Sequence, residues 1–523
     1  MKKSMQQIMT VALSLLLVIA MVGCSDKQSG DTPQNGEQGE KAGEAGQQET
    51  VTFKILRKIS APEYPADGGV GRTLLLEYAA KNGVTGVDFK VDTVAPNEYD
   101  SKLNLLAASG ELPDYFAITL KTMNRFAEED FLMELDSLAE KMPNAQKYWR
   151  PEDLEAAKYK GKLYAFPGGY RPEPVNRPYA GGFVVRKDWL ENVGLEKPET
   201  LDDFYHVIKA FTLNDPDQNG ENDTYGLGAQ KADLSIMDNN EAYFGGIFGA
   251  YGVFPTFWHE RDGQLKHGST LPETKEVLAL LQTWYKEKLI EPEFMIMDKK
   301  QREERMSNSK VGIVPADAWY LNPRNSVNRS LKQAVPEAEL ILIEPPKGPK
   351  GHMGWASKAP GYSEINAISA QCEHPELLVK FLDVLLKEPE SGGPFVNAGI
   401  EGESFTYDQS TNTVNFIQTS KEQWAMGFAH PVQFIKVVDR RWVTEPTLKQ
   451  GLEIANQYVI ENDFWKTVPA MRDYPDLAKL WNKYFVEIVC GERPLDDWEE
   501  YVAKWYKQGG AEVEKQVNEQ WKK

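Results

Sequence analysis

The chain has 523 residues, of which 41% are hydrophobic and 11% aromatic, and it carries 78 acidic against 59 basic residues. This length exceeds what one hydrophobic core normally supports, so we expect two large lobes or one very large domain. The formal net charge of −19, without a long basic run, argues against nucleic acid as a partner, because phosphate binding draws on Lys/Arg patches.

The N-terminal residues have the pattern of a secretory signal. A short basic start precedes an apolar run at 8–22, which is too short for an ordinary membrane-spanning helix and ends at Gly23 and Cys24. The segment resembles a bacterial lipoprotein signal, in which the cysteine is acylated with fatty acids such as palmitate and becomes the mature N-terminus. Met21 stands where that motif usually has Leu, and plain secretion with an incidental cysteine is the alternative. We expect a protein that is anchored to the membrane through Cys24 without crossing it.

The next segment, to about residue 50, contains no aromatic or large aliphatic side chain. Such a segment cannot bury apolar surface, so we expect a disordered tether, and about 26 residues of it would reach on the order of 28 Å. With Cys24 lipidated, Cys372 and Cys490 remain, and their surroundings in the sequence favour two free thiols over a disulfide.

Folded sequence begins with an alternating strand at 51–56, followed by a helix at 72–81, a strand at 87–93, a helix at 99–108 and a strand at 112–118. Strands and helices that alternate at this spacing are typical of an α/β lobe with a mainly parallel sheet.

Two segments are interpreted as crossings between lobes. In the first, at 161–190, Pro167 cannot donate to a central ladder and the glycines after it permit unusual φ/ψ, so the chain should turn away there. An ordinary surface loop between two strands of one sheet is the alternative. The second crossing lies near 354–361, between strands expected at 309–315 and 365–369. We therefore expect a signal peptide at 1–23, a tether at 24–50, an N-lobe of 51–170 and 311–355, and a C-lobe of 171–310 and 356–523.

The sequence predicts a helix with Thr200 as its N-cap and Asp203 three residues on, in a pattern close to a capping box. A loop rich in Asp and Asn follows this helix. Its spacing is that of an EF-hand loop, in which Gly220 permits the sharp turn and Gly226 stands at the twelfth position, where a bidentate Glu is usual. The expected ligands of a structural Ca²⁺ ion are Asp215, Asp217, Asn219, Asp223 and the backbone carbonyl of Glu221. A solvated Asx-rich turn is the alternative.

Several motifs, in this order along the chain, resemble the extracellular solute-binding proteins of family 1. They are the lipoprotein signal and Gly-rich tether, Ser-Gly-Glu-Leu-Pro-Asp at 109–114, Gly-Lys-Leu-Tyr-Ala-Phe-Pro at 161–167, Val-Arg-Lys-Asp-Trp-Leu at 185–190, Ala-Ile-Ser at 367–369, His-Pro-Glu at 374–376, and the C-terminal 491–498, 509–510 and 518–520. These proteins are lipoprotein receptors of carbohydrate ABC importers, similar to maltose- and alginate-binding proteins.

The resemblance implies the class II periplasmic-binding fold, in which two α/β lobes are joined by crossing segments and the ligand binds in the cleft. It also implies a calcium loop in some members, where an acidic residue usually follows the position of Asp223. Thr224 stands there in this chain.

Motifs of common enzymes are missing from the sequence. It contains no Gly-x-Ser-x-Gly, His-Glu-x-x-His or Walker loop, and its six histidines show no ligand spacing. We therefore expect a protein without enzymatic activity. The resemblance implies a monomeric receptor on the extracytoplasmic face of the cell membrane, which captures an oligosaccharide and delivers it to the permease of an ABC importer. A peptide-binding receptor of the same fold and a secreted carbohydrate-active enzyme are the alternatives.

Sugar rings present apolar C–H faces and hydroxyl edges, so their recognition needs Trp or Tyr platforms with polar side chains beside them. The candidates at lobe edges are Glu63, Tyr170, Arg171, Trp258, Asp317, Trp319, Tyr320, Trp355, Arg440 and Trp442, with Arg441 beside the last two. Asp317 and Trp319 form the strongest pair, because the strand before them should end at the cleft. The resemblance supports this pair, since maltose-binding-like proteins carry a Trp at the corresponding place.

Overall fold

The computed structural model describes residues 50–58, 64–95, 98–172, 181–231, 244–356, 365–387, 398–411, 413–428, 432, 435–438 and 445–522; at 169–172 and 436–438 it describes the backbone alone. These residues lie in the compact unit Glu49–Lys523. The predicted signal peptide and tether lie outside the described residues.

The first sheet has five strands and a mixed direction. Their order is β2 (Val87–Val94), β1 (Val51–Lys58), β3 (Tyr115–Ile118), β15 (Ile365–Ile368) and β6 (Phe166–Pro167). β1 runs parallel to β2 and β3, whereas β15 is antiparallel to β3 and β6. The predicted alternation of β1 is confirmed at its start, where Phe53 and Ile55 are buried and Thr52 and Lys54 are exposed, but it ends at Leu56, which is buried as well.

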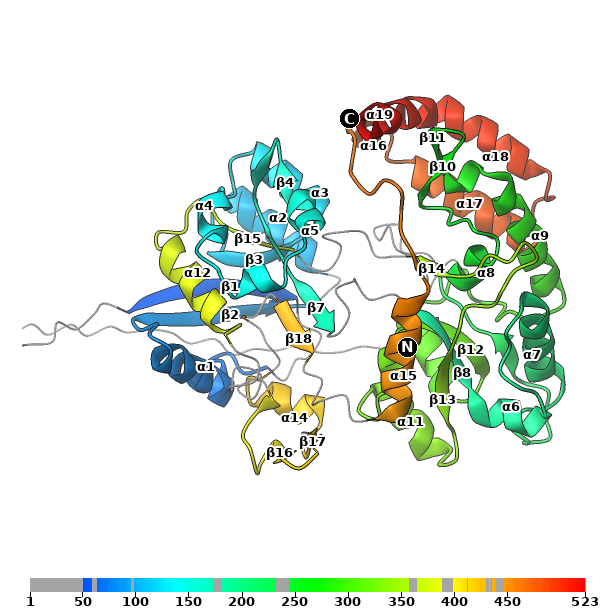
Figure 1. Ribbon diagram of the computed structural model, residues 1–523, viewed down its shortest axis with the longest axis horizontal. Helices are drawn as coiled ribbons and strands as arrows, with labels where there is room; N and C mark the ends of the chain where they lie inside the picture. Colours follow the sequence, from blue (N-terminus) through cyan, green and yellow to red (C-terminus); the bar gives the residue numbers. More distant parts are fainter. Residues whose placement is uncertain are drawn as a thin grey trace, which may run out of the picture. The chain divides into compact units, whose positions relative to one another are not determined.

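Helices cover this sheet, and Figure 1 shows several of them beside its strands. They are α1 (Gly69–Lys81), α2 (Tyr99–Ser109), α3 (Leu120–Glu128), α4 (Asp136–Ala139), α5 (Pro151–Ala156) and α12 (Pro375–Val384). Their apolar faces form one core with the strands, in which Leu75, Leu103 and Phe381 are buried. Two small elements, β4 (Lys158–Tyr159) and β5 (Lys162–Leu163), form a hairpin before β6.

The second sheet has four strands, in the order β13 (Leu340–Ile343), β8 (Gly182–Arg186), β12 (Val311–Ala316) and β9 (Tyr225–Leu227). β8 is antiparallel to both neighbours, and β12 is parallel to β9. Its helices are α6 (Lys187–Val193), α7 (Leu201–Leu213), α8 (Gly245–Gly249), α9 (Pro272–Lys286), α10 (Lys299–Ser307), α11 (Ser326–Ala334) and α15 (Pro446–Gln457). The predicted cap of α7 is confirmed, because Thr200 and Asp203 form a reciprocal capping box.

The chain changes sheet within the first predicted crossing and again between β13 and β15, whereas the second predicted crossing, at 354–361, lies mostly outside the described residues. The predicted division of the lobes is wrong for two segments. β6 belongs to the first sheet and β8 to the second, so the chain changes sheet within 161–190. Residues 311–355 were expected in the N-lobe, yet β12 and β13 pair with β8 in the second sheet. Conversely, β15 and α12 were expected in the C-lobe and lie in the first sheet and its core. The sequence of a fully buried strand such as β12 is equally hydrophobic in either sheet. It therefore predicts that the strand is buried, but not which strand it pairs with.

Smaller elements lie along the connections. They are the pairs β14 (Trp355–Ala356) with β19 (Val459–Ile460), β7 (Gly169–Pro172) with β18 (Ile435–Val438), and β16 (Phe405–Asp408) with β17 (Thr413–Phe416), and the helix α14 (Ser420–Ala425). The turn after α14 packs on α1, because Gly71 N donates to Met426 O at 2.8 Å. A Cβ at Gly71 would lie 2.2 Å from Gly427 O, so this approach requires glycine.

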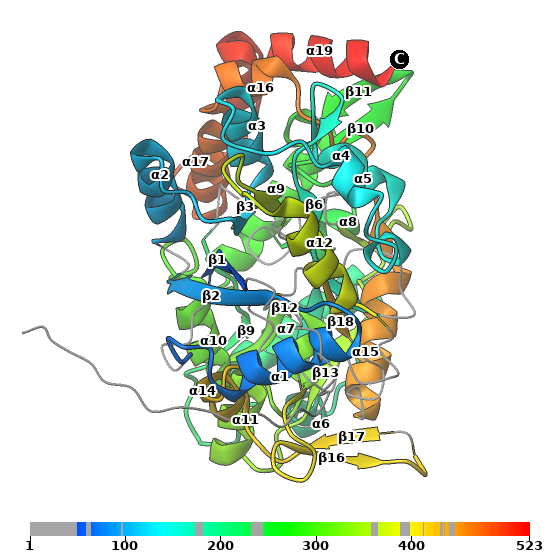
Figure 2. The same ribbon diagram turned by 90° about the vertical axis from the view of Figure 1, so that its left-hand side faces the viewer.

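The C-terminal helices extend the core of the second sheet. They are α16 (Pro469–Asp473), α17 (Leu477–Val489), α18 (Asp497–Trp505) and α19 (Ala511–Trp521). Figure 2 shows α19 beside the hairpin of β10 (Trp258–Arg261) and β11 (Gln264–His267). Cys372 and Cys490 are both free thiols, as predicted.

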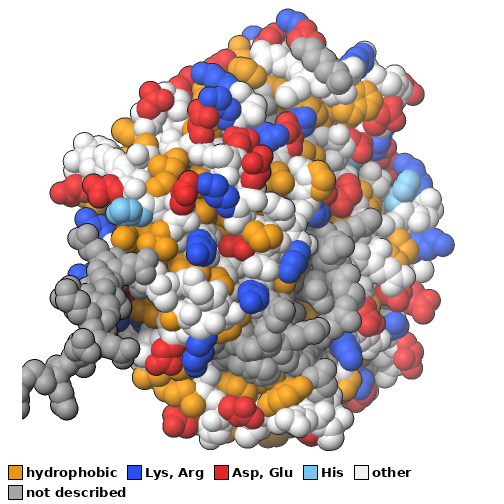
Figure 3. All heavy atoms as spheres, turned by 60° about the vertical axis from the view of Figure 1, so that its left-hand side comes forward, with side chains coloured by type: hydrophobic (Ala, Val, Ile, Leu, Met, Phe, Trp, Pro, Cys, Tyr) orange, Lys and Arg blue, Asp and Glu red, His pale blue; other side chains and the backbone are white. Residues whose placement is uncertain are grey.

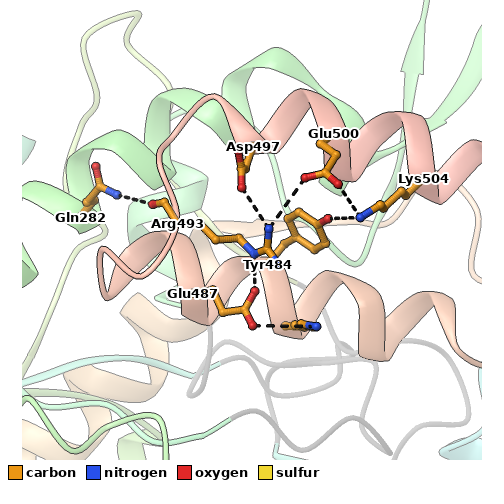
Figure 4. Close-up of polar contacts among 8 residues, drawn as sticks. Gln282, Tyr484, Glu487, Arg493, Asp497, Glu500 and Lys504 are labelled. Atoms are coloured by element: carbon orange, nitrogen blue, oxygen red, sulfur yellow. Dashed lines mark hydrogen bonds and ion pairs between the residues drawn. The ribbon is translucent and has the colours of Figure 1, made fainter.

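A charged cluster joins α17 to α18 (Figure 4). Arg493 pairs with Glu487 and with Asp497, the latter at 3.0 Å, and its guanidinium lies 4.6 Å from the ring centroid of Tyr484. Lys504 donates to the Tyr484 hydroxyl at 2.8 Å. Because several charges share partners, this network holds the two helices more firmly than an isolated surface pair would.

Candidate ligand-binding turn and cation loop

The strongest predicted pair lies in a short turn at the end of β12. This turn, η3 (Ala318–Leu321), begins after Asp317, whose Oδ1 accepts from Trp319 N at 2.8 Å. All residues of β12 are buried, whereas the Trp319 side chain is half-buried and packs by one side against the neighbouring core. The strand therefore ends where the sequence predicted, and it presents an aromatic ring and a carboxylate together.

Tyr320, the third candidate of the turn, points into the interior. It is 3% exposed, its hydroxyl donates to Glu303 Oε1 at 2.6 Å, and it accepts from Arg302 Nη2 at 3.0 Å. A side chain engaged in this way holds η3 against α10, so we remove Tyr320 from the candidate site.

Trp258 is also an interior side chain. It is 2% exposed and packs edge-to-face on His267, at 5.1 Å between ring centroids, and close to Trp505. Burial lowers the pKa of His267 to about 3, so this imidazole is neutral at neutral pH. Trp258 therefore joins β10 to α18, and we remove it from the candidate site.

Trp355 packs in the core of the second sheet. It is 1% exposed and meets Phe183 edge-to-face, with ring centroids 5.3 Å apart. A Cβ at Gly246 would lie 2.3 Å from the Trp355 ring, so this glycine is required by the close approach. Trp355 is removed from the candidate site for the same reason as Trp258.

The other predicted ligand residues are placed only in part. Tyr170 and Arg171 lie in β7, opposite Lys436 and Val437 of β18. The remaining candidates, Glu63, Arg440, Arg441 and Trp442, lie outside the described residues.

Arg324 was missed in the sequence and lies shortly after the turn. Its guanidinium stacks 3.7 Å from the ring centroid of Phe416 and donates to Gln423 Oε1 at 2.9 Å and to Gln418 O at 3.3 Å. Burial, followed by the nearby charge of Arg329, lowers the pKa of Arg324 to about 10. The Asn-Pro-Arg-Asn turn was the available signal, but its partners lie about ninety residues later and could not be inferred from spacing.

The predicted cation loop has an EF-hand-like backbone at its start. The carboxylate of Asp215 accepts from the backbone N of Asn219 and of Gly220, both at 3.0 Å, and Glu221 N donates to Asn219 Oδ1 at 2.7 Å. Asp217 Oδ2 accepts from the Asn219 amide at 3.0 Å, whereas its Oδ1 is buried and has no hydrogen-bond partner among the described residues. Hydrogen bonds from its own backbone thus close the loop, and one carboxylate oxygen, Asp217 Oδ1, is left without a hydrogen bond among the described residues.

The charges of the loop are balanced unequally. Burial, and then the neighbouring Asp215 and Asp223, raise the pKa of Asp217. A hydrogen bond from Lys310 lowers the pKa of Asp223, and the two side chains form an ion pair. Among the described residues, a positive charge therefore pairs with Asp223, and none pairs with Asp217.

The donor atoms of the loop fit Ca²⁺ in part. Asp215, Asp217 and Asp223 supply carboxylate oxygens, as a hard cation prefers. The Asn219 amide nitrogen donates to Asp217 Oδ2 and Asp223 Oδ1, and its oxygen accepts from Glu221 N, so this side chain must turn before its oxygen can bind a cation. A Glu at Gly226 is excluded, because a Cβ there would lie 2.1 Å from Ile208 O. Among the described residues, no three acidic, histidine or cysteine side chains are already arranged to hold a metal ion. The loop thus fits calcium in donor chemistry, with fewer ligands than an EF-hand and some rearrangement of its side chains.

Comparison with known proteins gives the family. A family model described as bacterial extracellular solute-binding protein matches residues 73–390, which is more than half of the chain. The chain belongs to this family. Its members are solute-binding proteins and not enzymes. Within the described residues, no helix is long and apolar enough to cross a membrane.

Two curated relatives come from Bacillus subtilis (strain 168). Lipoprotein LipO is 26% identical over 497 residues, covering 89% of this chain and 91% of the relative. The polygalacturonan/rhamnogalacturonan-binding protein YtcQ is 24% identical over 530 residues, covering 98% of each. The fructooligosaccharide ABC transporter substrate-binding protein FusA of Streptococcus pneumoniae is 26% identical over 399 residues, covering 71% of this chain and 68% of the relative.

Solved structures give the fold. The alginate-binding protein AlgQ2, determined without calcium ion, matches with a TM-score of 0.67 at 20% identity, over 91% of this chain and 98% of that one. FusA of S. pneumoniae in complex with kestose matches with a TM-score of 0.68 at 19% identity, over 90% of this chain and 99% of that one. The chain therefore has the class II periplasmic-binding-protein-like fold of two α/β lobes, as predicted from the sequence.

Proposed function

We propose that this protein captures an oligosaccharide outside the cell and delivers it to the permease of an ABC importer. This proposal rests mainly on the turn at the end of β12, where the half-buried Trp319 lies beside Asp317 in a chain of the extracellular solute-binding family. A ring of this kind stacks on the C–H face of a sugar, and the carboxylate accepts from its hydroxyls. The names of two relatives, which refer to fructooligosaccharide and to polygalacturonan, support a carbohydrate ligand.

The proposed site extends from this turn. Asp317 and Trp319 are its centre. Arg324 is added because it follows the turn closely in sequence and because its guanidinium contacts the neutral side chains of Phe416 and Gln423 among the described residues. Glu63, Tyr170, Arg171, Arg440 and Trp442 stay in the proposal from the sequence. The ligand would lie between the two lobes, with the crossings as hinges.

We further propose that Cys24 carries the lipid anchor and that the protein acts as a monomer on the extracytoplasmic face of the cell membrane. The similarity to lipoprotein LipO supports this proposal. The loop from Asp215 to Asp223 is proposed to bind Ca²⁺ as a structural ion, through the four side chains named above and the carbonyl of Glu221. When bound, the ion would neutralise the loop carboxylates and so brace the loop. Two solved structures support this proposal: that of AlgQ2, described as without calcium ion, and one of a FusA EF-hand mutant, which matches with a TM-score of 0.67 at 19% identity.

Uptake by cells tests the proposed function. Cells that lack this chain should take up a labelled oligosaccharide poorly at low concentration and recover when the native protein is restored, because capture limits import there. A labelled peptide of similar size serves as the matched control for the alternative receptor. Equal sugar uptake with and without the protein would contradict the proposal, and recovery of peptide uptake alone would favour the peptide receptor.

A further inference from the structure

Lys310 lies far from the cation loop in sequence and is placed against it by the second sheet. Its backbone O accepts from Tyr225 N at 2.9 Å, at the point where β9 and β12 begin to run parallel. This register brings the ammonium group of Lys310 to Asp223 Oδ2, with which it forms an ion pair. The pairing of β9 with β12 therefore fixes the backbone of Lys310 close to the loop that contains Asp223.

The positions that would complete a calcium shell are used for packing. Thr224 is 3% exposed and its hydroxyl donates to Phe211 O at 2.7 Å, so it is turned away from the loop. Gly226 N donates to the Thr212 hydroxyl at 2.9 Å, and the position has no room for a side chain. Neither position therefore adds an acidic group to Asp215, Asp217 and Asp223, and Lys310 offsets one of these three charges.

We propose that Lys310 is the built-in cation of this loop, and that calcium binds only by displacing the Lys310 ammonium from Asp223. This inference rests on the proposed calcium binding of the loop. An ammonium group on Asp223 neutralises one carboxylate and repels an incoming divalent ion, so it keeps the loop closed without metal and lowers its affinity for metal. Asp217 is left as the carboxylate through which the ion would first be held, since within the described part of the chain its Oδ1 has no hydrogen-bond partner.

The position of Lys310 connects the loop to the candidate ligand turn. Lys310 immediately precedes β12, and Asp317 immediately follows it. The same strand is therefore anchored at its start by the loop and presents the candidate turn at its end. With Lys310 as internal cation, this strand stays anchored when external calcium is scarce.

The test is the calcium affinity of Lys310→Met, measured by isothermal titration of the chelator-treated full chain with calcium chloride. Lys310→Met should bind Ca²⁺ roughly tenfold or more tightly than the native protein, because a nearby positive charge is removed. In chelator its melting temperature should fall below the native value, and added calcium should raise it by more than in the native protein. Lys350→Met, which breaks the exposed pair of Lys350 with Glu276 at 3.0 Å, is the matched control and should leave calcium binding unchanged.

A second variant locates the ion. Adding Asp217→Ala to Lys310→Met should abolish the gained calcium binding, whereas binding that survives would place the ion elsewhere and overturn the proposal. Equal calcium affinity of Lys310→Met and the native protein would overturn the role of Lys310 and leave the calcium site standing. Binding by neither protein would overturn both. Tight binding by the variant and weak binding by the native protein is the result that we expect.

Discussion

Trp319→Ala is expected to weaken oligosaccharide binding by roughly tenfold or more while the fold survives. The half-buried ring would lose a stacking contact worth about 1 to 3 kcal/mol if it behaves like other aromatic anchors, and each 1.4 kcal/mol is about tenfold in affinity. The fold should survive because β12 and the Asp317 contact to the backbone of residue 319 are independent of the ring. Titration calorimetry with a sugar that stabilises the native protein measures the effect.

Trp521→Ala is the matched control for this prediction. Trp521 is 37% exposed at the end of α19 and has no proposed contact with ligand, so its loss should leave the affinity unchanged. Native affinity in Trp319→Ala would remove this residue from the site. An equal loss in both variants would point to a general loss of stability.

Cys24→Ala is expected to move nearly all of the protein from the membrane fraction to the medium. An acylated cysteine would be the attachment to the bilayer, and the described residues contain no helix that could replace it. Immunoblotting of cell membranes and culture medium measures the distribution. Cys490→Ala, which alters a half-buried free thiol, should keep the protein in the membrane fraction. Unchanged retention of Cys24→Ala would contradict the lipid anchor.

The sequence predicted the elements of the fold better than their partners. Alternation at the start of β1, the capping box at Thr200 and the first crossing were readable because each depends on local periodicity or on Pro and Gly chemistry. The sheet to which β12 belongs was not readable, because all six of its residues are buried and carry no signal of the neighbouring strand.

The candidate site was predicted in part for a similar reason. Asp317 and Trp319 stay in the proposed site because they directly follow a strand and the Trp319 ring is half-buried, whereas Trp258 and Trp355, chosen as aromatic residues near Gly-rich loops, are core side chains. The Asp215 loop was recognisable from spacing alone. Its partner Lys310 was not, since the ion pair with Asp223 depends on the register of β9 with β12.

The central claim is that the protein binds an oligosaccharide and does not alter it, and one measurement tests this most directly. The native protein is incubated with a panel of plant and microbial oligosaccharides, its melting temperature is recorded for each, and the sugars are recovered and analysed by chromatography. Since a ligand that binds only the folded state stabilises it, at least one oligosaccharide should raise the melting temperature in a concentration-dependent way and be recovered intact. A shortened or modified product would contradict the claim in favour of an enzyme, and a broad panel without any stabilising sugar would contradict carbohydrate capture itself.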